Sequence, residues 1–520
     1  MSAFKKLAGD TALYGVSTIL ARSVNFALAP IQTYAFLQPS DLASNVTLYA
    51  WIGVLLTVYT LGLETAFFRF AARARGIENA DERQRVFNQA TSIVVLFGAA
   101  PTVLAVLFSD TVAGWLGYPD EGIAVVWAAL ILFVDAVVAI PFARLRVENK
   151  ARQFVAAKVI NILLNVALNI FFIVLCKDIS EGDYLPTLQP IASWIYRSEI
   201  GPGYILLGNL IANGLYFLFL RNAFAGFRLT FDASAAKKLL VYSFPIMLTG
   251  LSAVLNALTD RLMLRRWLPD GFYEGLTSED ALGIYGQCLK LSIFMALATN
   301  AFKFAADPFF FSQAEDKNSP KLLADVTKWF TIVCVLLWVG VSLNLDVIGL
   351  SISKRYRAGL DVVPLLLLAN LFLGVYYNIS FWFKLSDKTQ YGTLITVVGL
   401  VVTVAGNLLL IPVIGYMGCA VAFLVSSFVM MVLCYYLGER HYPVPYHVRS
   451  AGGYVLGAGV LIGVSWQFPI SNLWIAVPTH LILFGAFFLI VLFVERAAWQ
   501  PAMARFRQRS AKQNSHANDV

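Results

Sequence analysis

Long apolar segments separated by short polar connections run along almost the whole 520-residue chain. Each is close to the ~20 residues that an α-helix needs to cross a bilayer. Fourteen such segments can be counted, which predicts an all-α polytopic membrane protein with about 14 transmembrane helices. The segments are residues 11–35, 45–68, 87–108, 122–143, 158–176, 203–221, 239–264, 282–306, 327–348, 362–383, 391–411, 416–437, 451–468 and 473–494.

Composition and charge agree with this prediction and orient the helices. Hydrophobic residues make up 59% of the chain and charged residues 13%, which is about half the charged fraction of a soluble protein. Most Lys and Arg residues fall in alternate connections, on the side that holds both termini, and the positive-inside rule places that side in the cytoplasm. The net charge of +8 follows from this bias and does not indicate nucleic-acid binding.

Polar residues line one face of the first apolar segment. Arg22 falls near its middle, where a charge costs roughly 2.5–3.5 kcal/mol on insertion scales. The residues on this face, at helical spacing, are Thr11, Tyr14, Thr18, Arg22, Asn25 and Gln32. The pattern predicts that this face turns toward protein or water rather than toward lipid.

A short motif recurs at matching places in two halves of the chain. Thr65–Phe70 closes the second predicted span and Thr299–Phe304 closes the eighth, and both fit T-x-x-F-[RK]-F. Repeats with an even number of spans are related by an axis along the membrane normal, and two such lobes around a central site are typical of transporters. The predicted division is 1–221 (N-terminal lobe), 222–238 (cytoplasmic linker), 239–437 (C-terminal lobe), 451–494 (accessory helix pair) and 495–520 (basic cytoplasmic tail).

Charged side chains inside the predicted spans are candidates for a binding site. Arg22 and Lys290 are predicted to contact phosphate oxygens, because guanidinium and ammonium groups are common phosphate ligands in proteins. A structural ion pair with another helix is the alternative for both residues. Asp260 and Asp135 are candidates for binding a coupling cation or a proton, or else serve as ion-pair partners.

Asparagines at helical spacing mark further polar faces in the fifth and sixth predicted spans. They either hydrogen-bond one helix to another, for about 0.6 kcal/mol per bond, or form a hydrated wall that meets sugar hydroxyls. The stripes are Asn161, Asn165 and Asn169 in one span and Asn209 and Asn213 in the next. The candidate sugar-facing residues are Asn25, Asn161, Asn165, Asn169 and Asn256.

Motifs of enzymes and of metal sites are absent from the sequence. It has no G-x-x-x-x-G-K-[ST] loop and no H-E-x-x-H, and its five cysteines lack metal-ligand spacing. The longest outside connection, 177–202, has no recognisable pair of catalytic carboxylates. We therefore expect a transporter with no metal and no cofactor rather than an enzyme.

Four stretches resemble the polysaccharide and O-antigen flippases of the multidrug/oligosaccharidyl-lipid/polysaccharide (MOP) exporter superfamily. They are STILARSVNFALAPIQTYAF, GLETAFFRFAAR, DRLMLRRWLP and ALGIYGQCLKLSIFMALATNAFKFAADPFFF. The resemblance implies two six-helix lobes that form a V around a cavity. It also implies that cationic cavity residues, which Arg22 and Lys290 match, meet the diphosphate of an undecaprenyl-linked sugar. Residues 451–494 resemble the accessory pair that accommodates a lipid tail in some relatives.

The same resemblance implies a cellular role. Such proteins move lipid-linked oligosaccharide from the cytoplasmic to the outer leaflet of the bacterial cytoplasmic (inner) membrane, for lipopolysaccharide O-antigen or another surface polysaccharide. An H⁺ or Na⁺ gradient drives the cycle, and other polysaccharide-assembly proteins are potential partners.

Three rival functions remain open from the sequence. A MATE-like cation or drug antiporter of the same fold would need an acidic cavity, and Asp135 and Asp260 keep that reading open. A lipid II flippase of the same superfamily would carry more arginines in and beside the first span than this chain has. A membrane glycan polymerase or ligase would need a larger outside loop with catalytic residues.

Overall fold

The structure is a computed structural model of the chain and describes residues 28–73, 80–312, 319–386, 388–468, 470 and 472–496. Most of the first predicted span, including Arg22 and Asn25, lies outside the described residues, as does almost all of the basic tail. The described part of that span is helical from residue 28 to residue 35.

The regular elements of the described residues are all helices, and no strand occurs among them. The long ones are α2 (Ala43–Thr60), α4 (Ala80–Leu107), α6 (Gly122–Val147), α7 (Ala151–Ile170), α10 (Tyr204–Gly214), α12 (Ala233–Trp267), α13 (Ser278–Leu291), α14 (Ile293–Ser312), α15 (Ser319–Leu343), α17 (Val362–Ile379), α19 (Gln390–Ile414), α20 (Tyr416–His441), α21 (Val448–Gln467) and α22 (Leu473–Val494). In this part of the chain, 12 helices or continuous helical stretches are long and apolar enough to cross a membrane. The helices α13 and α14 are long and apolar enough only when taken together, and a bend of 42° separates them. The prediction of an all-α polytopic membrane protein is confirmed.

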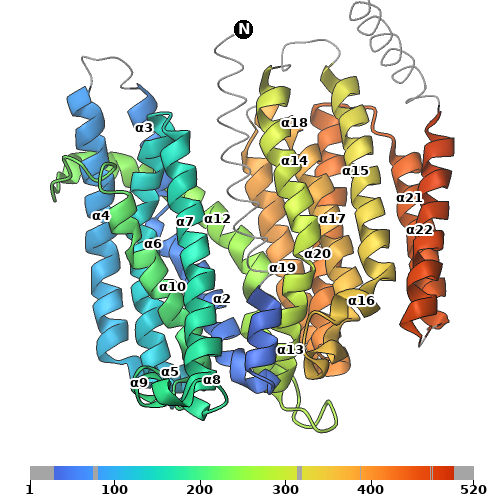
Figure 1. Cartoon of the computed structure of the whole chain (residues 1–520). Coiled ribbons are helices and arrows are strands. Elements are labelled where there is room, and N and C mark those ends of the chain that lie inside the picture. The colour runs from blue at the N-terminus through green and yellow to red at the C-terminus, as the bar shows by residue number, and fades with distance from the viewer. Residues whose placement is uncertain are drawn as a thin grey trace, which may run out of the picture.

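The helices form two bundles and a peripheral pair. Figure 1 shows the N-terminal bundle, with α2, α4, α6, α7 and α10, beside the C-terminal bundle, with α13 to α20. The long helix α12 contacts both, since it packs against α19 of the C-terminal bundle and against α2 of the N-terminal one. The pair α21–α22 lies at the outer edge of the C-terminal bundle, where both helices pack on α15.

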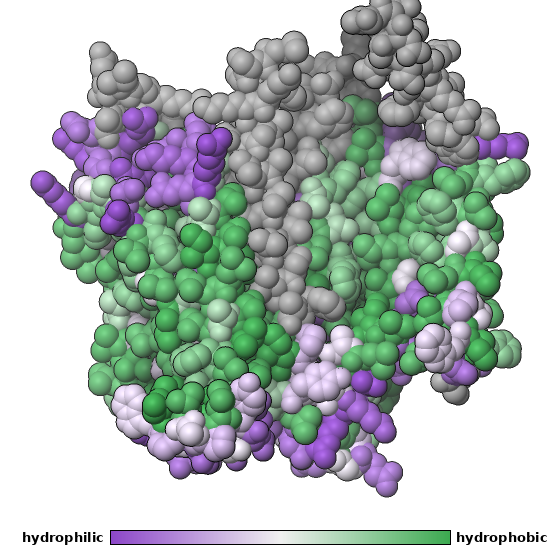
Figure 2. All heavy atoms as spheres, in the orientation of Figure 1, coloured by the Kyte–Doolittle hydropathy of each residue, from purple (hydrophilic) through white to green (hydrophobic). Residues whose placement is uncertain are grey.

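The surface of the bundles is apolar around its middle. In Figure 2 hydrophobic residues form a band, and hydrophilic residues gather at the two ends of the helices. Large apolar side chains of the long helices, such as Leu107, Leu409 and Leu456, are at least 70% exposed. Such exposure is stable in lipid, because acyl chains are as apolar as these side chains.

Two breaks interrupt helices near the contact between the bundles. The helix α2 ends at Leu61 and Gly62, whose φ angles of 51° and 67° are left-handed, and α3 (Leu63–Arg73) continues the span. A Cβ atom on Gly62 would lie 2.8 Å from the backbone oxygen of Ser243 in α12. Glycine therefore meets two demands here, a positive φ and a close approach of the two helices. The second break, at Ser292, separates α13 from α14.

The connection between the bundles is fastened to the N-terminal bundle. Its backbone donates from Thr230 N to Ser92 Oγ and from Asp232 N to Gln89 Oε1, both at 3.0 Å. The Asp232 side chain then caps α12, which begins at Ala233 within the predicted linker 222–238.

Candidate functional site

A cavity of about 560 Å³ lies between the two bundles, and both contribute to its wall. This volume falls in the range of small-molecule sites. Its polar and charged lining residues are Gln32, Asn45, Tyr49, Asn165, Asn209, Asp260, Arg261, Gln287, Lys290, Ser292 and Asn370. We call this space the inter-bundle cavity.

Lys290 occupies the last turn of α13, just before the break at Ser292. Its ammonium group donates a hydrogen bond to Oε1 of Gln32, which belongs to the polar face predicted for the first span. No ion pair among the described residues involves Lys290. The amine of Lys290 is therefore held by a neutral amide and by no carboxylate among the described residues.

Asp260 contributes the acidic group among the described lining residues. Tyr285 OH of α13 donates to Oδ2 at 2.6 Å, and the backbone N–H of Arg261 donates to Oδ1 at 2.8 Å. Arg261 Nε lies 4.0 Å from the same oxygen. The described wall thus holds two basic side chains and one carboxylate, and this carboxylate is already hydrogen-bonded within the C-terminal bundle.

Amide side chains of the N-terminal bundle form the opposite wall. Asn165 lines the cavity and accepts a hydrogen bond at Oδ1 from Asn169 Nδ2, at 2.7 Å. Asn209 of α10 donates to Tyr49 OH of α2 at 3.0 Å, and both residues line the cavity. Of the predicted sugar-facing residues, Asn165 thus lies on the wall, and Asn169 is fully buried behind it.

Three further candidates lie within a bundle, outside the lining of the cavity. The candidates Asn161 and Asp135 are connected through Asn213. Asn161 of α7 donates to Asn213 Oδ1 of α10 at 2.9 Å, and Asn213 donates to Asp135 Oδ1 of α6 at 2.8 Å. Asn256 of α12 accepts hydrogen bonds at Oδ1 from Thr403 of α19 and Ser426 of α20. Arg22 and Asn25 lie outside the described residues.

Several lining residues were not among the candidates. Asn45, Tyr49, Gln287 and Asn370 were not singled out, although Asn45 and Tyr49 share a helical face and Gln287 lies one turn before Lys290. Arg261 sits near the end of the predicted span 239–264, a position from which the long side chain of an arginine commonly reaches the membrane interface. The helical face of α12 carries both Asp260 and Arg261 to the cavity instead.

At one end of the cavity, side chains of the C-terminal bundle form hydrogen bonds with the N-terminal bundle. Arg265, near the end of α12, donates from Nη1 to Leu116 O and from Nη2 to Gly117 O, both at 2.7 Å. These oxygens end the short helix α5 (Ser109–Leu116), where the helix dipole favours a cation. Arg265 also pairs with Glu279 of α13 at 2.5 Å.

Aromatic packing completes this contact, which we call the Arg265 latch. The guanidinium carbon of Arg265 lies 4.2 Å from the ring centroid of Tyr118. Burial raises the pKa of Tyr118 to about 12, so its hydroxyl is neutral and shares a hydrogen bond with Thr47 Oγ1 at 3.1 Å. In the predicted topology the latch lies at the outer end of the bundles.

The backbone of residues 36–42 closes the same end. Tyr356 OH donates to Phe36 O at 2.7 Å, and Ser40 N donates to Asp280 Oδ1 at 3.0 Å. The chain between the first span and α2 is therefore held by groups of the C-terminal bundle. The described residues thus show closure between the bundles at the predicted outer end.

Comparison with known proteins identifies solved structures with a similar fold. No protein-family model and no curated protein sequence matches the chain. Among solved structures it is similar to the lipid II flippase MurJ in an inward-closed conformation, with a TM-score of 0.67 and 13% identity over 92% of this chain and 98% of that one. It is also similar to an inward-facing multidrug resistance MATE family transporter of the MOP superfamily, with a TM-score of 0.55 and 13% identity over 87% of this chain and 100% of that one. A eukaryotic MATE transporter gives a TM-score of 0.52 and 14% identity over 88% and 98% of the two chains. The chain has the fold of MOP-superfamily transporters.

Proposed function

We propose that the chain is a flippase that moves a polyprenyl-diphosphate-linked oligosaccharide from the cytoplasmic to the outer leaflet by ion-coupled alternating access. The observation that carries the proposal is Lys290 in the wall of the inter-bundle cavity, hydrogen-bonded to neutral Gln32 instead of a carboxylate. A diphosphate head group cannot cross hydrocarbon unaided, because burying its charge is prohibitive. A polar cavity with net positive charge removes that barrier.

The cavity wall offers separate chemistry for the two parts of such a head group. Lys290 and Arg261 supply positive charge for the diphosphate, and in this proposal Arg22 adds to them. Asn165 and Asn209 on the opposite wall supply amide groups that match sugar hydroxyls. The isoprenoid tail would remain in lipid, beside the pair α21–α22.

Two carboxylates are available for ion coupling in this proposal. Asp260 is 5% exposed and contacts the cavity, and its Tyr285 partner can follow its protonation state because the hydroxyl both donates and accepts. Asp135 does not line the cavity; it accepts a hydrogen bond from Asn213, which accepts one from Asn161 on the same helix as the lining residue Asn165. Transport by D260N and D135N variants with and without an H⁺ or Na⁺ gradient assigns the role.

The test is transport of a lipid-linked oligosaccharide in proteoliposomes. Lys290→Ala should lower the rate roughly 10- to 100-fold, which corresponds to one lost charge-assisted contact, and Lys290→Arg should retain most of it. Lys237→Ala, an exposed lysine at the start of α12, is the matched control. Gln32→Glu should also slow transport, because a carboxylate would hold the ammonium in an ion pair. Wild-type rates for K290A and Q32E at equal protein levels would contradict the proposal.

The same assay separates the rival substrates. A cationic drug would be attracted by Asp260, so a MATE-like antiporter should lose drug transport in D260N and keep it in K290A. Lipid II carries the same diphosphate as other polyprenyl-linked sugars, so the cavity charge does not distinguish them. Parallel vesicles with lipid II and with an O-antigen-type lipid identify the preferred sugar.

A further inference from the structure

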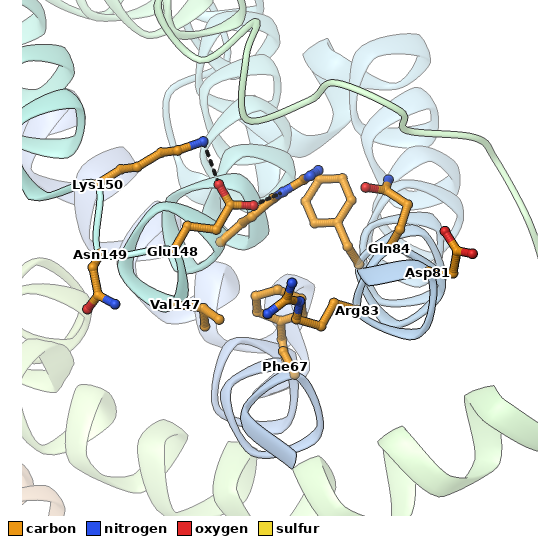
Figure 3. Close-up of a pocket in the computed structure, with 11 residues that line it drawn as sticks. Phe67, Asp81, Arg83, Gln84, Val147, Glu148, Asn149 and Lys150 are labelled. Carbon is orange, nitrogen blue, oxygen red and sulfur yellow. Dashed lines mark hydrogen bonds and ion pairs between the residues drawn. The ribbon is translucent and has the colours of Figure 1, made fainter. Parts of the chain in front are cut away.

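A second hollow, of about 640 Å³, lies inside the N-terminal bundle and apart from the inter-bundle cavity. Its wall comes from the end of α3, the start of α4 and the end of α6 with the turn that follows. All of these helix ends lie on the side of the bundle that is predicted to face the cytoplasm. We call this space the α3–α4–α6 pocket, and Figure 3 shows it in close-up.

The floor of the pocket is apolar and its rim is charged. Phe67 and Phe87 form the floor, and both are almost completely buried. The charged residues of the wall are Asp81, Arg83, Arg144, Glu148 and Lys150. Three bases and two acids leave one net positive charge, which matches a single phosphodiester anion.

Two of the three bases already have partners. Arg144 donates from Nε to Glu148 Oε1 at 2.7 Å, contacts the backbone oxygens of Ala223 and Ala225, and lies over the ring of Phe87. Lys150 Nζ lies 2.7 Å from Glu148 Oε2. Burial by itself would raise the pKa of Glu148, but the hydrogen bonds and charges of Arg144 and Lys150 outweigh burial and lower it. Glu148 is thus ionised, and the charges of Arg144 and Lys150 balance its negative charge within the wall.

Arg83 is different, because no acidic side chain of the described residues forms an ion pair with it. In Figure 3 its guanidinium reaches from α4 into the hollow beside Phe67, while Glu148 and Lys150 occupy the opposite side. Lys150 retains ammonium hydrogens beyond the bond to Glu148, and its side chain is 49% exposed. Arg83 and Lys150 therefore lie on two sides of the hollow, at helix ends that are predicted to face the cytoplasm.

We propose that the α3–α4–α6 pocket binds the phosphodiester head group of an anionic phospholipid from the cytoplasmic leaflet, between Arg83 and Lys150. Basic pockets between transmembrane helices at this depth suit such head groups. A phospholipid fits better than a soluble phosphate, since the floor is aromatic and the pocket opens where head groups are concentrated. The inference concerns a site separate from the transport cavity and does not rest on the proposed substrate.

The experiment uses the full chain in neutral detergent and measures retained lipid by native mass spectrometry, with phosphatidylglycerol and phosphatidylcholine as probes. Arg83→Gln should weaken phosphatidylglycerol binding about fivefold, the effect of one basic residue at a lipid surface. Arg85→Gln is the matched control, because Arg85 lies two residues away on α4 and is exposed outside the pocket wall. Glu148→Gln should act in the opposite direction and tighten binding, since it releases Lys150 and removes a negative charge.

The possible results separate the sources of the phosphate. Equal phosphatidylglycerol binding by wild type, R83Q and E148Q would overturn the proposal, as would equal retention of both lipids. Competition by glycerol phosphate at the concentration of the lipid would assign the pocket to a soluble phosphate instead and would also overturn it. Transport by R83Q can be measured in parallel, so failure of lipid binding and failure of the proposed transport function are distinguishable.

Discussion

The Arg265 latch gives the sharpest prediction about movement between the bundles. Arg265→Gln removes the bonds to Leu116 O and Gly117 O and weakens the contact with Tyr118. A hydrogen bond from a charged donor contributes about 1.5–3 kcal/mol, and a partly exposed cation–π contact about 0.5–1 kcal/mol. The Arg265 side chain is 20% exposed and such contributions are not additive. We therefore expect the substitution to destabilise the closed state relative to the open state by about 2–4 kcal/mol. The ratio of open to closed states should rise roughly 30-fold or more.

A distance between the outer ends of the bundles measures this ratio. Spin labels on cysteines at Asp120 and Asp270 would report it by pulsed electron paramagnetic resonance, since both positions are exposed and lie in different bundles. The five native cysteines are buried and should remain unlabelled. We expect one short distance in the wild type and an added, longer distance in R265Q.

A glycine pair provides an independent perturbation with its own control. Gly117→Ala would place a Cβ atom 1.9 Å from Arg265 Nη1 at a φ of +86°, so it disturbs the latch while the arginine remains. Gly271→Ala carries similar backbone strain, at a φ of +73°, but meets no atom within 4 Å. The longer distance should appear in G117A and be absent in G271A. If R265Q and G117A both keep the wild-type distribution, the latch does not hold the bundles together.

Three further predictions test packing and charge elsewhere. Gly62→Ala should destabilise the protein by about 1–3 kcal/mol in a thermal unfolding assay, because its Cβ would press on Ser243 O at a left-handed φ; an unchanged midpoint would show that α2 and α12 can separate at no cost. Lys328→Met should cost about 3–5 kcal/mol, since it strands the buried carboxylate of Glu495 that Lys328 holds at 2.6 Å, and Lys328→Met with Glu495→Gln should recover most of it. The lowered pKa of Glu148 means that its contribution to stability is complete above the unfolded pKa of about 4.5 and is lost as pH falls through the folded pKa; E148Q should therefore show a smaller loss of stability over that acidic range than the wild type.

The order and type of the elements could be predicted from the sequence because hydrophobic length alone decides them. The described residues contain helices at the thirteen predicted spans after the first one. The break at Ser292 was not predictable, since no proline or glycine occurs in the run from Lys290 to Ala296. The start of α12 at Ala233 was also missed, because Lys237 and Lys238 precede the apolar run and the Asp232 cap, not an apolar sequence, marks the start of the helix.

The candidate site could be predicted less completely, for a geometric reason. Helical spacing shows that Asn161 and Asn165 share a face, but the cavity reaches Asn165 while Asn161 turns to Asn213 within the bundle. Asp135 and Asn256 were likewise recognisable as buried polar groups, and their partners on other helices lie far away in the sequence. Periodicity identifies a polar face but not the neighbour that the face meets.

Lys290 lines this cavity with a neutral partner in place of a carboxylate, since its ammonium group donates to Oε1 of Gln32 in the first span. A carboxylate in the place of Gln32 would stabilise the ammonium more strongly, but it would also compete with any anion that enters. A neutral amide partner therefore leaves Lys290 available to an anion that enters the cavity, which a buried ion pair would not do.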